Sequence, residues 1–369
     1  MINLKKYSKE SLMGSLFFLS FFISSAQEIT WRNPLTEQVV LGRSKELKES
    51  DGYNRLPAAL KQDVREPVWY LGQQDAGVYV EFSTPAENIY VRYTVKDKLE
   101  MGHMPATGVS GLDLYAQDPK DKSWKWAHGK FSFKDTITYN FLNIGSHPEY
   151  QYRLYLPLYN HVKWMEIGTK TGEAISFKSN EKKPIVVYGT SIAQGACATR
   201  PGLGWTNMLG RNFDQPVINL AFSGNGRLEQ PILDLINRMD PAVYILDCIP
   251  NLALKGARTA DTLTNLIENA VRTLRKDHPN TPIIMTAHSS SQLKDVLNQH
   301  TNEEFAASSA VAEKTIKSLI KKGDKNLYWV SSQDIGMDIN STVDYTHPND
   351  IGMQKLADVY TKLLKKVMR

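Results

Sequence analysis

The chain has 369 residues, a formal net charge of +5 and 22% charged residues, with Lys and Arg interleaved among Asp and Glu. No arginine-rich face with interleaved aromatic residues is found, so the composition argues against a nucleic-acid partner. A single core rarely serves a chain of this length, which predicts two domains.

The first 26 residues have the pattern of an export signal. Lysines within residues 5–9 precede an apolar run at 12–23, and the small residues 24–26 form a cleavage site. The run is shorter than the roughly 20 apolar residues that span a bilayer, which disfavours the alternative of a membrane anchor. We therefore expect residues 1–26 to be removed, and the protein to be periplasmic or extracellular without a stable membrane anchor.

Residues 27–180 predict an all-β domain. Its candidate strands are rich in Val, Tyr, Phe and Trp, several alternate apolar with polar residues, and turn clusters separate them. These strands are 78–84, 88–95, 111–118, 124–133 and 150–159. No long amphipathic helix interrupts them, so we predict a β-sandwich or jelly-roll.

Residues 181–369 predict an α/β domain. Short apolar runs alternate with helical segments, and the runs are 185–189, 217–222, 243–248, 282–287 and 326–331. Near-continuous apolar strands separated by helices indicate a parallel sheet covered on both faces, here a flavodoxin-like three-layer sandwich with five strands. In such sheets a ligand binds at the carboxyl ends of the strands, so functional residues should follow strands directly.

Four loops at these positions carry chemically useful groups. Ser191 follows the first strand, Gly224 lies in a glycine-rich turn after the second, and Asn251 follows the third. His347 stands before the last helix, three residues after Asp344. Each loop alone is compatible with an ordinary turn or helix cap. Together they supply the nucleophile, base, carboxylate and hydrogen-bond donors that acyl transfer requires.

These four blocks, Ser, Gly, Asn and His in this order, resemble those of the SGNH (GDSL-like) hydrolase superfamily. The first block departs from the common Gly-Asp-Ser by having Gly-Thr-Ser at 189–191, and the third has Asp-Cys-Ile-Pro-Asn at 247–251. These departures, with Gly-Leu-Asp-Leu-Tyr at 111–115, resemble a branch that carries an N-terminal GxDLY-motif domain. The resemblance covers nearly all of the expected mature chain.

The resemblance implies a serine esterase that works through an acyl-enzyme. His347 would take the proton of Ser191, while Asp344 orients the imidazole. The backbone N–H groups of Ser191 and Gly224 and the amide of Asn251 would bind the oxyanion. No cofactor is implied, and no metal-ligand spacing is present.

Four further residues are candidates for contacts with the substrate, each with a structural alternative. His288 follows the fourth strand and is a rival base or a structural histidine. Arg200 follows the nucleophile turn and binds the substrate or is an ordinary loop arginine. Glu229 begins a helix, where the helix dipole alone favours a carboxylate. His103 and the segment 108–115 either cover the mouth of the Ser191 pocket or form a tight loop.

The cysteines, Cys197 and Cys248, are expected to be a buried structural pair, either bonded or free. The oligomeric state is not indicated.

The leading hypothesis is a secreted carbohydrate esterase that removes O-acetyl groups from an acylated small molecule or polysaccharide. A lipase or lysophospholipase is the alternative within enzymes, although no amphipathic lid or basic interfacial helix is present. The alternative from another class is a catalytically inactive glycan-binding protein, which the intact Ser, Asp and His disfavour.

Overall fold

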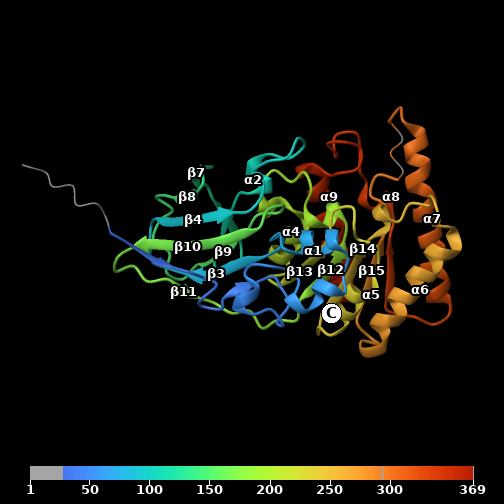
Figure 1. Cartoon of the computed structure of the whole chain (residues 1–369), viewed down its shortest axis with the longest axis horizontal. Coiled ribbons are helices and arrows are strands. Elements are labelled where there is room, and N and C mark those ends of the chain that lie inside the picture. Colours follow the sequence, from blue (N-terminus) through green and yellow to red (C-terminus); the bar gives the residue numbers. More distant parts are fainter. Residues whose placement is uncertain (1–27, 292, 294, 369) are drawn as a thin grey trace, which may run out of the picture.

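The computed structural model describes residues 28–291, 293 and 295–368 (Figure 1). The expected export signal, residues 1–26, lies outside them. Within the described ranges, no helix is long and apolar enough to cross a membrane.

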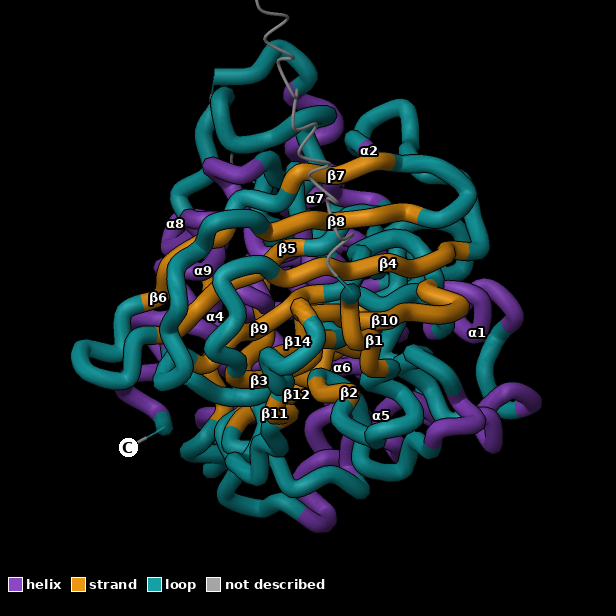
Figure 2. The backbone as a smooth tube through the Cα atoms, turned by 90° about the vertical axis from the view of Figure 1, so that its left-hand side faces the viewer, coloured by secondary structure: helices purple, strands orange, loops and turns teal. Residues whose placement is uncertain are grey.

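The N-terminal half consists of two antiparallel sheets with an apolar core between them, which confirms the predicted all-β architecture. Figure 2 shows the first sheet in the order β7, β8, β4, β10, β1. Its strands are β1 (Ile29–Arg32), β4 (Ile89–Val95), β7 (Lys130–Ser132), β8 (Ile137–Phe141) and β10 (Val162–Lys170). The second sheet has the order β11-β3-β9-β5-β6, with β2 beside β3. Its strands are β2 (Val40–Leu41), β3 (Tyr79–Ser83), β5 (Asp113–Gln117), β6 (Trp124–Ala127), β9 (Gln151–Tyr155) and β11 (Ser176–Phe177).

Two details of the sandwich differ from the sequence prediction. The single strand predicted at 124–133 is two strands in different sheets, because β6 pairs with β5 whereas β7 pairs with β8. The chain crosses between the sheets at Gly129, where a Cβ atom would lie 2.7 Å from the Phe141 ring. The prediction also missed β8 and β10. A register shift between Val162 and Trp164 breaks the alternation of β10 that would have marked it as a strand.

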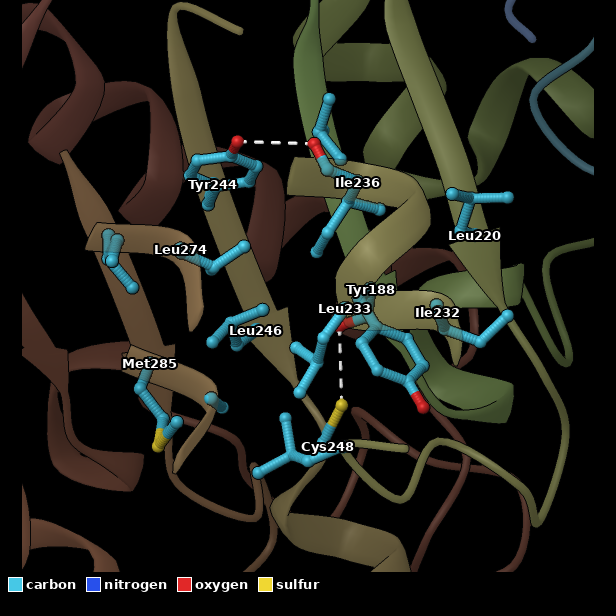
Figure 3. Close-up of a cluster of buried hydrophobic side chains, with 14 of the residues drawn as sticks. Tyr188, Leu220, Ile232, Leu233, Ile236, Tyr244, Leu246, Cys248, Leu274 and Met285 are labelled. Carbon is cyan, nitrogen blue, oxygen red and sulfur yellow. Dashed lines mark hydrogen bonds between the residues drawn. The ribbon is translucent and has the colours of Figure 1, made fainter. Parts of the chain in front are cut away.

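The C-terminal half is a parallel five-stranded sheet of order β13-β12-β14-β15-β16, which confirms the flavodoxin-like prediction. Its strands are β12 (Ile185–Gly189), β13 (Val217–Ala221), β14 (Val243–Asp247), β15 (Ile283–Thr286) and β16 (Leu327–Val330). On one face pack α5 (Gln230–Asn237), α6 (Ala260–Asp277) and α7 (Gln299–Lys321). Figure 3 shows side chains of α5 packed against those of the sheet. On the other face pack α4 (Trp205–Asn212) and α9 (Asp350–Val367).

Shorter helical segments complete the described chain. They are α1 (Glu66–Gly72), α2 (Ala106–Val109), α3 (Ser191–Gln194) and α8 (Ser332–Ile335), and the 3₁₀ turns Glu49–Asp51, Ala58–Gln62, Pro201–Leu203 and Ile249–Asn251. The segment that includes α1 belongs to the N-terminal half in sequence, yet Leu56, Leu60 and Val68 are buried in the same core as α5, α6 and α7. The two halves therefore share part of one hydrophobic core.

Arg55 joins the two halves through the open edge of the parallel sheet. Strand β13 is an edge strand, and alternate residues of it direct their carbonyl groups away from β12. Arg55 is fully buried and donates hydrogen bonds to two of these carbonyl oxygens, of Asn219 (2.9 Å) and Ala221 (2.8 Å). It also donates to the carbonyls of Leu71 (2.7 Å) and Gln74 (2.6 Å). The guanidinium group thus satisfies acceptors that a neighbouring strand would otherwise pair with.

The cysteines are both buried and free. Cys197 packs in the core on the α4 and α9 face, whereas Cys248 packs in the core on the α5 face, where its thiol points to the Tyr188 carbonyl (Figure 3). The sheet separates the two thiols, so of the two expected alternatives, bonded or free, the structure has the free one.

Candidate active site

Ser191 lies at a sharp turn from β12 into α3. Glycine is required at the end of the strand, because a Cβ atom on Gly189 would lie 2.6 Å from the Cβ of Ala193. Thr190 caps the helix by accepting a hydrogen bond from Ile192 N (3.3 Å). As the first residue of the helix, Ser191 has a backbone N–H without an acceptor inside the helix. Hydroxyl and N–H therefore lie together at the carboxyl edge of the sheet.

A continuous series of hydrogen bonds links Ser191 to His347 and Asp344. The Ser191 Oγ lies 2.8 Å from His347 Nε2, and His347 Nδ1 lies 2.7 Å from Asp344 Oδ2. The other carboxylate oxygen accepts from the backbone N of His347 (2.8 Å). The intervening Tyr345 has a left-handed backbone with φ 71°, which brings Asp344 back onto the imidazole.

The negative charge on Asp344 determines which tautomer of the His347 imidazole is favoured. Burial would raise the pKa of Asp344, but hydrogen bonds from the side chain and backbone of His347 outweigh it, and the pKa lies below its ordinary value. An ionised carboxylate favours the tautomer with the proton on Nδ1 of His347. Nε2 is then free to accept the proton of the Ser191 hydroxyl.

The loops after β13 and β14 meet beside this series. Gly224 has a left-handed backbone (φ 68°), and no atom lies within 4 Å of the position of an added Cβ, so its backbone faces open space. The side-chain oxygen of Asn251 accepts a hydrogen bond from Gly226 N (3.0 Å), which fixes the orientation of its amide group. Gly226 packs tightly against the end of β12, since an added Cβ would lie 2.2 Å from the Gly189 carbonyl oxygen. These contacts bring candidate N–H donors to the strand end that carries Ser191.

Arg200 contacts the GxDLY motif. Its Nη1 donates to Asp113 Oδ2 and to the hydroxyl of Tyr115, both at 2.6 Å, and its guanidinium lies over the Trp126 ring at 4.5 Å. Asp113 also accepts from Gly202 N (2.9 Å). The motif therefore holds the loop that follows the Ser191 turn.

The same loop reaches the segment that carries His347. Thr107 Oγ1 donates to the carbonyl of Thr199 (2.7 Å), and Thr199 in turn donates to Asp350 through its backbone N (2.9 Å) and hydroxyl (2.6 Å). Asp350 begins α9, three residues after His347. A chain of contacts thus runs from the sandwich through this loop to the segment that positions the imidazole.

Replacing Arg200 with methionine is expected to lower the free energy of unfolding by about 2–3 kcal/mol, because Asp113 is only 3% exposed and would lose its cation. Urea denaturation measures this change. The matched control is Arg238→Met, which breaks an exposed ion pair with Glu46 and should cost under about 1 kcal/mol. An Arg200 variant no less stable than this control would contradict a stabilising role of the ion pair between Arg200 and Asp113.

Glu229 forms an ion pair with Arg65 of the N-terminal half. Its carboxylate accepts a hydrogen bond from Arg65 Nε, and its backbone N donates to the Tyr188 hydroxyl (3.0 Å). Arg65 Nη1 also donates to Asn225 Oδ1 (2.7 Å), within the glycine-rich loop. Sequence reasoning missed Arg65, because 164 residues separate it from Glu229 and no local pattern marks it.

His288 lies in the interior. Its side chain is 1% exposed, its Nδ1 accepts from Ser290 N (3.2 Å), and its ring stacks on Phe305 at 3.6 Å. Phe305 stacks in turn on Tyr345 at 5.6 Å, in the loop that carries Asp344 and His347. Burial, with a smaller effect of the nearby His347, lowers the pKa of His288 to about 3. The imidazole is thus neutral and a weak base.

This burial makes stability depend on pH. The unfolded chain protonates His288 below about pH 6.5, whereas the folded chain does so only near pH 3. Between these values the unfolded state binds more protons, so the free energy of unfolding falls as pH falls, by about 2 kcal/mol between pH 7 and pH 5 from this group.

Urea denaturation at the two pH values should show a smaller loss for His288→Gln than for wild type. The exposed His300→Gln variant should keep the wild-type difference. Equal pH sensitivity of His288→Gln and wild type would contradict the prediction.

His103 lies next to His347. The two rings are 5.9 Å apart between centroids and tilted by 41°. The carbonyl of His103 faces the thiol of Cys197 (3.6 Å). Burial, with the negative charge of Asp344, raises the pKa of Cys197 to about 12, so this thiol stays protonated and serves as a packing group.

Two cavities, of about 500 and 620 Å³, lie at the opposite edge of the parallel sheet, and none of the candidate site residues lines them. They are therefore separate from Ser191, which lies at the carboxyl edge of the sheet. Among the described residues, no group of three or more His, Cys, Asp or Glu side chains is arranged to hold a metal ion.

Comparison with known proteins gives matches along most of the chain. The family described as GDSL-like lipase/acylhydrolase matches residues 182–365, and the N-terminal GxDLY domain of SGNH-hydrolase-type esterases matches residues 29–175. A Bacteroides ovatus protein described as a GDSL-like lipase is 31% identical, with a TM-score of 0.81, over 92% of this chain and 98% of its own. No curated protein matches.

More distant solved structures share the fold. A salicylyl-acyltransferase from a tetracycline biosynthetic pathway is 17% identical, with a TM-score of 0.72, over 92% of this chain and 97% of its own. A family two carbohydrate esterase from Cellvibrio japonicus is 13% identical, with a TM-score of 0.53, over 79% of this chain and 89% of its own.

Proposed function

The chain belongs to the GDSL-like lipase/acylhydrolase family, and from this membership we propose that it is an exported serine esterase that removes O-acetyl groups from a carbohydrate. The observation that carries the proposed reaction is the hydrogen-bonded series of Ser191, His347 and Asp344.

The reaction proceeds in two acyl transfers. Ser191 Oγ attacks the ester carbonyl carbon, and its proton passes to His347 Nε2. The carbonyl oxygen, now negative, accepts hydrogen bonds from the backbone N–H groups of Ser191 and Gly224 and from the Asn251 amide. The alcohol leaves with the proton from His347, and the acetyl group stays on Ser191. Water then attacks this acyl-enzyme by the same steps and releases acetate.

The alcohol side of the substrate is the side where His103 lies. His347 must reach the leaving oxygen to protonate it, so the alcohol occupies the space beside the imidazole. The exposed imidazole of His103 lies beside that space, with its ring centroid 5.9 Å from the ring centroid of His347. A polar side chain there suits the hydroxyl groups of a sugar. The fold shared with a carbohydrate esterase is consistent with this assignment.

The test is acetate release from a panel of acetylated polysaccharides by wild type and Ser191→Ala, beside hydrolysis of 4-nitrophenyl acetate and a longer 4-nitrophenyl ester. Acetate release that depends on Ser191 supports the proposal. A strong preference for the longer acyl chain would favour a lipase, and hydrolysis of no ester would favour an inactive glycan-binding protein.

His103→Ala is expected to lower kcat/KM on acetylated xylan by about tenfold, because a hydrogen bond to the sugar is lost. The loss on 4-nitrophenyl acetate, whose leaving group has no sugar hydroxyl, should be smaller. The exposed His300→Ala variant is the control. Equal losses on both esters would contradict a sugar contact.

A further inference from the structure

Two arginines flank the loops that carry Gly224 and Asn251. Arg227 is exposed and donates from Nε (3.3 Å) and Nη2 (3.2 Å) to the carbonyl of Gly224. Arg258 is half-buried and donates from Nη1 to the carbonyl of Ala253 (3.2 Å), two residues after Asn251. Since Asn251 is itself bonded to Gly226, the two loops form one edge of the site, and each places a guanidinium group there.

Neither guanidinium is neutralised. In the described part of the chain, no carboxylate forms an ion pair with Arg227 or Arg258. Other arginines have at least one such partner, among them Arg65, Arg153, Arg200, Arg238 and Arg275. Glu229, the nearby carboxylate of the same loop, is already paired with Arg65.

The two positive charges are also close enough to oppose each other. Burial lowers the pKa of Arg258, and the positive charge of Arg227 lowers it further. Like charges held together without a counterion destabilise the protein that carries them. The unfavourable term is offset when an anion binds between them, and guanidinium groups suit carboxylates because their N–H donors match the two oxygens.

We propose that Arg227 and Arg258 form a subsite for a carboxylate of the substrate, so that the preferred substrate is an acetylated acidic polysaccharide. This inference rests on the proposed function. An acetyl group has no ionisable atom, so the negative charge must be on the sugar residues of the chain. A uronate-containing glycan has the required chemistry.

The experiment compares acetate release from acetylated polygalacturonate and from neutral acetylated xylan. Wild type should have the higher kcat/KM on the acidic polymer, and added salt should reduce this preference, because ions screen exposed charges. Arg227→Gln and Arg258→Gln should each lower the ratio of acidic to neutral kcat/KM, and the double variant should lower it by about tenfold. Arg227→Lys should retain part of the ratio.

Arg272→Gln is the matched control. Arg272 is an exposed arginine of α6 that donates a hydrogen bond to Asn269, so its substitution should leave the ratio unchanged. A ratio that is insensitive to Arg258→Gln, or equal losses on both polymers, would overturn the subsite. If the wild-type protein did not hydrolyse 4-nitrophenyl acetate, the proposed function itself would be refuted. Failure of the subsite and failure of the proposed function are therefore distinguishable.

Discussion

Ser191→Ala is expected to lower kcat for ester hydrolysis by about 10⁴–10⁶-fold, because no other hydroxyl lies at hydrogen-bonding distance from His347 Nε2 among the described residues. The substitution removes one oxygen atom and leaves the helix cap at Thr190 in place. KM and the melting temperature should change little, since the Ser191 hydroxyl holds no part of the core. Steady-state kinetics with 4-nitrophenyl acetate and thermal denaturation measure both quantities.

The control for this prediction is Ser308→Ala. Ser308 is also buried, on α7, and its hydroxyl donates a hydrogen bond to the carbonyl of Phe305 (3.4 Å). This variant should keep the wild-type kcat. If Ser191→Ala retained more than about a hundredth of the wild-type rate, another residue would have to be the nucleophile.

Arg55→Met should lower the free energy of unfolding by roughly 4 kcal/mol. Methionine fills much of the same volume but donates no hydrogen bond. Four carbonyl oxygens, three in buried and one in a part-buried hydrogen bond, therefore lose their donor, each at a cost of about 1 kcal/mol or more. Burial lowers the pKa of Arg55 to about 10, so the wild-type group is charged at neutral pH and makes strong hydrogen bonds. Urea denaturation measures the loss.

Two variants sharpen this test. Arg55→Lys keeps a charge but cannot direct donors to four separate carbonyls, so it should lie between wild type and Arg55→Met. Arg272→Met, on the surface of α6, should change stability by less than about 0.5 kcal/mol. A cost below about 1 kcal/mol for Arg55→Met would mean that the edge of β13 does not depend on the arginine.

The architecture of the C-terminal half could be predicted because its strands are apolar throughout and therefore stand out from the helices. The same runs fix where each strand ends, which is why Ser191, Gly224 and Asn251 could be selected as candidates before their geometry was known. Asp344 and His347 could be paired because only three residues separate them.

Contacts between distant segments could not be predicted. Arg200 and Glu229 were candidates for substrate contacts, each with a structural alternative. Their partners in the structure are Asp113, 87 residues from Arg200, and Arg65, 164 residues from Glu229. The role of Arg55 could not be predicted, because a lone arginine between turns belongs to no periodic sequence pattern. The GxDLY motif could be recognised as a motif, yet its physical role depends on the surface that it meets.

The arginine at the edge of β13 bears on how such proteins can be recombined. A fragment that begins at β12 would leave the Asn219 and Ala221 carbonyls unpaired and open to strand addition from a second copy. Exchange of the N-terminal half between relatives would therefore succeed only where the donor brings an equivalent of Arg55 together with a counterpart for Arg200. The C-terminal half is therefore expected to be exchanged between relatives together with its own N-terminal half.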